Sequence, residues 1–176
     1  MKTSRSRLAG NFKQHTLIFQ SNVEREGTNI VAVWPGANWL TLEDRPLVIG
    51  AHWDVVNGTS GFNDNGSGVA VLLELARVLT ASECFRPEHT ILFVAFDTEE
   101  AGSIGSYEFV RRIVVPFFAA RGLTMTGTYI LDTLINYDPA PGAQTIKPAW
   151  EESMPQFVKD VKDHDYRGDF IATVRR

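Results

Sequence analysis

Three short segments decide the fold of this chain: residues 47–54 read LVIGAHWD, residues 61–68 read GFNDNGSG and residues 91–100 read ILFVAFDTEE. The first and third segments begin with short apolar runs that are rich in β-branched or aromatic side chains. Such runs are typical of strands that are buried on both faces of a parallel sheet. A histidine and acidic residues follow these runs, at the strand ends where open α/β sheets build their sites.

The flanking sequence predicts further strands and helices. The predicted strands are residues 15–20, 28–34, 46–52, 90–96 and 128–131. The first two form a hairpin joined by residues 22–27. Apolar residues at helical spacing predict a helix after the glycine-rich loop, which Ser67 can cap. A second helix begins near Ser106 and is interrupted or ended by Pro116.

A last helix is predicted at residues 154–163, with Ser153 as its cap, after a proline-rich loop at residues 138–148. The alternation of strands and helices implies an α/β fold of three layers, α/β/α, with a mixed, mostly parallel sheet. We expect one partial domain over residues 1–176. It consists of a polar segment (1–14), an N-terminal hairpin (15–34) and a core that carries the site (46–137).

Composition excludes several classes of protein. The formal net charge of −4 and the scattered basic residues argue against a nucleic-acid partner. No apolar segment approaches the roughly 20 residues of a membrane-spanning helix. Cys84 is the single cysteine, which excludes an internal disulfide and a cysteine metal cluster. Oligomeric state cannot be read from the sequence.

The strand ends predict a metal site. Three predicted strands end at or just before potential ligands, which are His52, the pair Glu99-Glu100, and Asp132. The loop after the first of these strands adds Asp64. One imidazole and several carboxylates form an oxygen-and-nitrogen environment suited to zinc, with manganese or cobalt as alternatives. Such a cluster could hold two metals joined by a bridging carboxylate, and a further carboxylate would act as general base.

The complete pattern resembles the M28 metallopeptidases, a family of zinc aminopeptidases and related exopeptidases. Its parts are His52-x-Asp54, Gly61-x-x-Asp64-Asn65-x-Ser67-Gly68, Phe96-Asp97-x-Glu99-Glu100-x-Gly102-Ser103-x-Gly105-Ser106 and Leu131-Asp132. The resemblance implies a phosphorylase/hydrolase-like fold, a peptide substrate, two zinc ions and hydrolysis of a terminal peptide bond by metal-activated water. It also implies a secreted protein or one of the secretory pathway.

The resemblance also implies a role for each site residue. Asp64 is expected to bridge both zinc ions, with His52 and Asp132 as further ligands of one ion and Glu100 as a ligand of the other. Glu99 is expected to be the general base. Asp54 is expected to orient His52.

One family ligand, a histidine near the C-terminus, has no counterpart here. We interpret His164 as a surface histidine at a solvated helix end. The chain is accordingly expected to be a fragment or a shortened form. Alternatives to the exopeptidase are a non-catalytic interaction domain of the same fold, an inactive truncated isoform, a hydrolase of another amide, or a cyclising acyltransferase.

Overall fold

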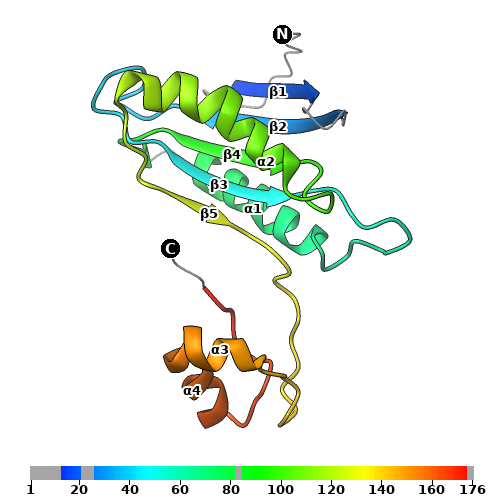
Figure 1. Cartoon of the computed structure of the whole chain (residues 1–176). Coiled ribbons are helices and arrows are strands. Elements are labelled where there is room, and N and C mark those ends of the chain that lie inside the picture. Colours follow the sequence, from blue (N-terminus) through cyan, green and yellow to red (C-terminus); the bar gives the residue numbers. More distant parts are fainter. Residues whose placement is uncertain (1–12, 21–25, 82–84, 174–176) are drawn as a thin grey trace. The chain divides into compact units, whose positions relative to one another are not determined.

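The computed structural model of this chain describes residues 13–20, 26–81 and 85–173 (Figure 1). The chain divides into two compact units, Met1–Thr133 and Leu134–Arg176, here named unit 1 and unit 2. The expectation of one domain over residues 1–176 stays a prediction.

Unit 1 is built on one mixed sheet. Its described strands are β1 (Lys13–Gln20), β2 (Glu26–Trp34), β3 (Leu47–His52), β4 (Ile91–Phe96) and β5 (Gly127–Ile130). Their order is β1-β2-β4-β3-β5, with β2 antiparallel to β1 and β4, and β3 parallel to β4 and β5. The predicted strands and the mixed sheet are confirmed. Most of the predicted hairpin connection, residues 22–25, lies outside the described residues.

One face of the sheet packs on α1 (Gly66–Ala81). Leu72 of this helix lies in a buried cluster with Ile49 of β3 and Phe93 of β4. Because successive side chains of a strand point to opposite faces, Val48 and Val94 face the other way and join a second cluster. Figure 1 shows helices on both sides of the sheet, so the predicted three-layer arrangement is confirmed.

The second cluster packs on a continuous helical segment. It runs from α2 (Ile104–Phe109) through a π-helix, η1 (Val110–Phe118), to a short 3-10 helix, η2 (Ala119–Arg121). The prediction that Pro116 interrupts or ends the helix is wrong, because this residue lies inside η1. Proline removes one backbone donor. Phe118 beyond it is buried in the same cluster, and burial of an aromatic side chain contributes roughly 1.5–3 kcal/mol toward offsetting the cost of this proline.

Unit 2 contains α3 (Pro148–Ser153) and α4 (Pro155–Asp163). The last predicted helix is confirmed, whereas α3 was not predicted. The expectation that Ser153 caps α4 is wrong, since Met154 takes the cap position and Ser153 Oγ donates to the Ala149 carbonyl oxygen at 2.8 Å. None of the helices in the described ranges has the length and apolar character needed to cross a bilayer.

Candidate metal centre

His52 ends β3 and is the buried member of the site, with 3% of its surface exposed. The residue after it, Trp53, donates its backbone N–H to the Phe96 carbonyl oxygen of β4 at 2.8 Å. Nδ1 of His52 lies 3.1 Å from the carbonyl oxygen of Asp54. Because a carbonyl oxygen only accepts, Nδ1 is the donor in this contact, and Nε2 is the ring nitrogen that would bind a metal in place of a proton.

Two carboxylates face that Nε2. Asp64 Oδ1 lies 3.1 Å from Nε2, and Asp132 Oδ1 lies 3.7 Å from it. One potential ligand atom from each of the three residues lies within 4.8 Å of the others. Both aspartates are more than half exposed, so the group opens to water on its carboxylate side. One imidazole and two carboxylates fit a divalent zinc-type ion with a position left for water or substrate.

The loop that carries Asp64 is fixed by the start of α1. Asn65 precedes this helix, and its Oδ1 accepts the backbone N–H of Gly68 at 3.0 Å, so Asn65 is the N-cap. The expectation that Ser67 caps the helix is wrong. Ser67 already lies within the first turn, and its Oγ donates back to the Asn63 carbonyl oxygen at 2.7 Å.

Asp54 links the turn after β3 to the turn after β4. Its Oδ1 accepts the backbone N–H of Glu99 at 3.0 Å, and its Oδ2 accepts that of Glu100 at 3.1 Å. Oδ1 also lies 3.5 Å from His52 Nδ1, farther than the Asp54 carbonyl oxygen. The structure thus places Asp54 beside His52, and its role in orienting the ring stays a prediction.

Glu99 and Glu100 lie in the turn that follows β4. Ser103 donates its hydroxyl to Glu99 Oε1 at 3.1 Å and its backbone N–H to the Glu99 carbonyl oxygen at 2.7 Å. Glu100 is exposed and, among the described residues, stands outside the group of three possible ligands. The structure therefore brings His52, Asp64 and Asp132 together and places both glutamates on a neighbouring turn.

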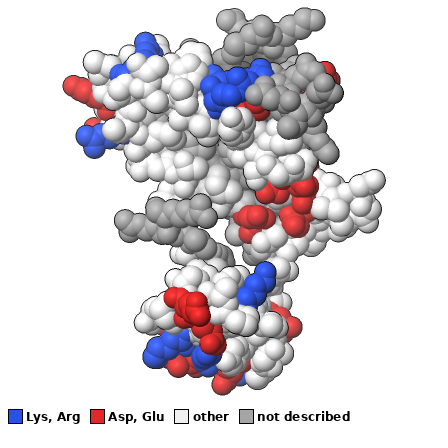
Figure 2. All heavy atoms as spheres, in the orientation of Figure 1, with Lys and Arg blue, Asp and Glu red and all other residues white. Residues whose placement is uncertain are grey.

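Negative charge at this edge changes the pKa values of two side chains. Burial acts to lower the pKa of His52, but the charges of Asp132, Glu99 and Asp54 and the hydrogen bond to the Asp54 carbonyl oxygen together outweigh this effect and raise the pKa. Partial loss of water and the charge of Asp64 raise the pKa of Glu100. Figure 2 shows acidic side chains gathered on unit 1 where β3 ends in Figure 1. A cation bound here would neutralise this excess charge.

Two buried asparagines, for which sequence reasoning assigned no role, hold the turns of the site. Asn65 is 1% exposed and Asn29 is fully buried. Asn29 donates from Nδ2 to the Gly105 carbonyl oxygen at 2.7 Å, and its Oδ1 accepts the backbone N–H of Asp97 at 2.9 Å. Two sequence features could have indicated these roles. Asn29 is an amide side chain inside an apolar strand, and Asn65 stands directly before the start of a helix.

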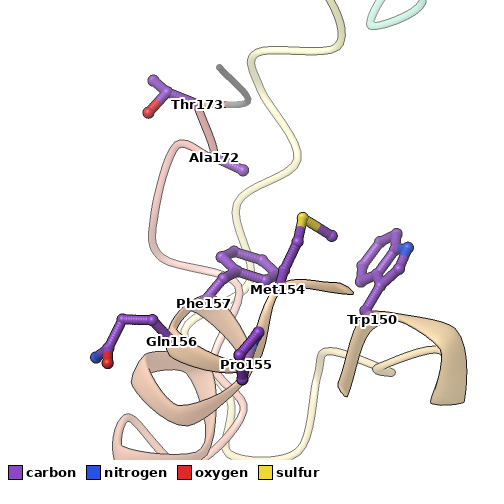
Figure 3. A pocket seen from close by; sticks show the side chains of 7 residues that line it. All are labelled: Trp150, Met154, Pro155, Gln156, Phe157, Ala172 and Thr173. Atoms are coloured by element: carbon purple, nitrogen blue, oxygen red, sulfur yellow. The ribbon is translucent and has the colours of Figure 1, made fainter. Parts of the chain in front are cut away.

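A separate hollow lies within unit 2. Its volume is about 450 Å³, and Figure 3 shows the side chains of Trp150, Met154 and Phe157 along it. The lining residues supply no carboxylate or imidazole, so this hollow does not fit a metal. His164, also in unit 2, is exposed just after α4, which agrees with its interpretation as a surface histidine.

The chain is similar in sequence to known peptidases. The model of Peptidase family M28 matches residues 29–165. Aminopeptidase YwaD of Bacillus subtilis (strain 168) is 35% identical over 99 residues, which are 56% of this chain and 20% of that protein. A Glutamate carboxypeptidase 2 homolog of Caenorhabditis briggsae is 46% identical over 74 residues, which are 40% of this chain and 9% of that protein.

Among solved structures, the aminopeptidase from Aneurinibacillus sp. strain AM-1 is similar, with a TM-score of 0.52 and 30% identity. That similarity covers 61% of this chain and 24% of the aminopeptidase. In all three comparisons, the matched part of this chain spans less than a quarter of the other protein.

Proposed function

Because this chain belongs to peptidase family M28, we propose that it acts as a zinc-dependent exopeptidase, and specifically as an aminopeptidase, on peptide substrates. One observation carries the proposal. The buried His52 presents Nε2 to the carboxylates of Asp64 and Asp132, while its Nδ1 is fixed by a backbone carbonyl oxygen. With Nδ1 as the donor to that carbonyl oxygen, Nε2 and the two carboxylates form a donor set that fits zinc.

His52, Asp64 and Asp132 would hold one zinc ion, and Asp64 would share a second ion with Glu100. The charge of Asp64 already raises the pKa of Glu100, so the two carboxylates lie within electrostatic reach of each other. When bound, zinc would act as a Lewis acid that polarises a carbonyl oxygen and lowers the pKa of a bound water toward neutrality.

Glu99 would be the general base. Its carboxylate accepts a hydrogen bond from Ser103, and its backbone N–H donates to Asp54. Both contacts restrict the position of the Glu99 side chain. A carboxylate beside the ligand group would take the proton of the attacking water and pass it to the leaving amine. Asp54 acts here as a positioning residue for this turn and for His52.

The charge of the site favours a free amino terminus. A peptide N-terminus is cationic near neutral pH, and the carboxylate charge at this edge (Figure 2) that bound zinc does not neutralise would attract it. Blocking that amine removes the attraction. An aminopeptidase should therefore discriminate strongly against blocked substrates.

The test uses the full chain after removal of metal by a chelator. We expect hydrolysis of aminoacyl-anilides to appear only when zinc is added back, and acetylated anilides to remain uncut. Zinc content would be measured in the same samples. Hydrolysis that is indifferent to zinc, or an absence of zinc binding, would contradict the proposal.

A further inference from the structure

We propose that Asn65 is a positioning residue that fixes Asp132 relative to Asp64, an inference that rests on the zinc site proposed above. Asn65 follows Asp64 directly in the chain. Its side chain forms hydrogen bonds with the backbone of Leu131 and Thr133, the residues on either side of Asp132 in the sequence. The amide would thus hold two ligands from distant parts of the sequence in one geometry.

The contacts of this amide are specific. Nδ2 donates to the Leu131 carbonyl oxygen at 2.9 Å, and Oδ1 accepts the backbone N–H of Thr133 at 3.2 Å. Oδ1 also accepts the N–H of Gly68 in the first turn of α1. Because the amide is buried, these hydrogen bonds are sheltered from water and a lost partner would be costly.

The segment around Asp132 requires such support. β5 ends at Ile130, and the next residue, Leu131, donates its N–H to the Gly50 carbonyl oxygen at 2.8 Å. Beyond it, Thr133 adopts a φ of 48°, in the left-handed region that β-branched residues rarely occupy. Such a conformation persists where surrounding contacts determine it, and the hydrogen bond from Thr133 N–H to Asn65 Oδ1 is one such contact.

Close packing leaves little freedom at this junction. A Cβ atom added at Gly68 would collide with Asn65 Oδ1 and with the Leu131 carbonyl oxygen. The start of α1, the Asn65 amide and the end of β5 are therefore in direct contact. Movement of the amide would shift Asp132 together with its neighbours.

A purely structural role is the alternative, since Asn65 also caps α1. The variant Asn65→Ser separates the two roles. Serine caps helices about as well as asparagine, so the Gly68 N–H keeps an acceptor. One short hydroxyl cannot also bond to Leu131 and Thr133, so only the link to Asp132 is lost.

The experiment measures zinc affinity of the full chain by competition with a chromophoric chelator, together with amide hydrogen exchange followed by NMR. For Asn65→Ser we expect affinity to fall about tenfold or more, the range for residues that orient metal ligands. We also expect the Thr133 amide to lose protection while the Gly68 amide keeps it.

Thr90→Val is the matched control. Thr90 is buried just before β4, at the end of this strand that lies away from the site, and its hydroxyl donates to Asp44 Oδ2 at 2.7 Å. This variant also removes a buried hydrogen bond, yet zinc affinity should stay within about twofold, because only residues near the ligands orient them. An Asn65→Ser chain that binds zinc like the wild type would overturn the inference.

Failure of the proposed function gives a different result. A wild-type chain without zinc affinity contradicts the zinc site itself. The positioning inference is then decided by exchange in the metal-free chain. If the Thr133 amide loses protection in Asn65→Ser while the Gly68 amide keeps it, the inference is supported. If the protection of the Thr133 amide is unchanged, the inference is contradicted.

Discussion

Two regions supply carboxylates to the same proposed site, but their side chains are held differently. One region is the corner where β3 and β5 end, and the other is the turn that follows β4. At the corner, the side chains of His52, Asp64 and Asp132 already lie together. In the turn, Asp54 holds the backbone of Glu99 and Glu100, whereas the Glu100 carboxylate is exposed. One half of the site thus already has its ligand side chains together, whereas in the other half Glu99 is held through both its backbone and its carboxylate and Glu100 is held through its backbone. Metal affinity should therefore come mainly from the corner, and catalysis should depend on the turn.

Glu99→Gln is the sharpest test of this division. We expect hydrolysis to fall by roughly 10²–10⁴-fold, the contribution of a general base. Zinc affinity should change little because the corner is untouched. Steady-state kinetics and zinc titration of one preparation would check both. Equal losses in activity and zinc affinity would show that the two halves are not separate.

His52→Ala should have the next largest effect. Loss of the buried nitrogen ligand is expected to weaken zinc binding by about a hundredfold or more, since even residues that only orient ligands contribute 10–100-fold. Glu100→Gln is the matched comparison from the turn and should cost less. Calorimetric titration would rank the two variants, and the reverse ranking would contradict the comparison.

Asp54→Asn tests the link between the two halves. The amide can accept only one of the two N–H bonds from Glu99 and Glu100, so the turn should loosen. Both zinc affinity and hydrolysis should fall by about tenfold, as for other residues that orient ligands. A fall in zinc affinity alone would limit the role of Asp54 to the corner, and a fall in hydrolysis alone would limit it to the turn.

Glu108→Gln should leave the site intact and alter stability instead. Glu108 is 1% exposed, and hydrogen bonds from Arg111 and Arg112 lower its pKa. A lowered pKa stabilises the fold above the unfolded-state pKa, and this stabilisation is lost as pH falls through the folded-state value. Urea unfolding at pH 7 should show that the free energy of unfolding falls by about 1.5–3 kcal/mol, the range for charged hydrogen bonds. The stability of the variant should also fall less steeply at acidic pH than that of the wild type.

Glu74→Gln is the control for this prediction. Glu74 pairs with Arg77 at the same three-residue spacing, but both side chains are exposed. Exposed pairs contribute little, so the variant should unfold like the wild type. A loss as large as that of Glu108→Gln would remove burial as the explanation.

Much of the fold could be predicted from short patterns. The apolar runs before His52 and Asp97 predicted β3 and β4, and the ends of parallel strands predicted that His52 and Asp132 meet at one edge. These features follow from local periodicity and sheet geometry.

Other features depend on contacts that no local pattern contains. Asn65 bonds to residues 131 and 133, far away in sequence, so its place in the site required coordinates. The helix continues past Pro116 to Phe118, which is buried against the sheet, so local preference does not decide where this helix ends. The left-handed backbone of Thr133 likewise depends on its surroundings.

The most direct test is an anomalous difference map from crystals of the full chain grown with zinc. The account predicts a peak about 2.0–2.2 Å from His52 Nε2 and from one oxygen each of Asp64 and Asp132. Zinc bound elsewhere in the molecule, with no peak between these three side chains, would contradict it.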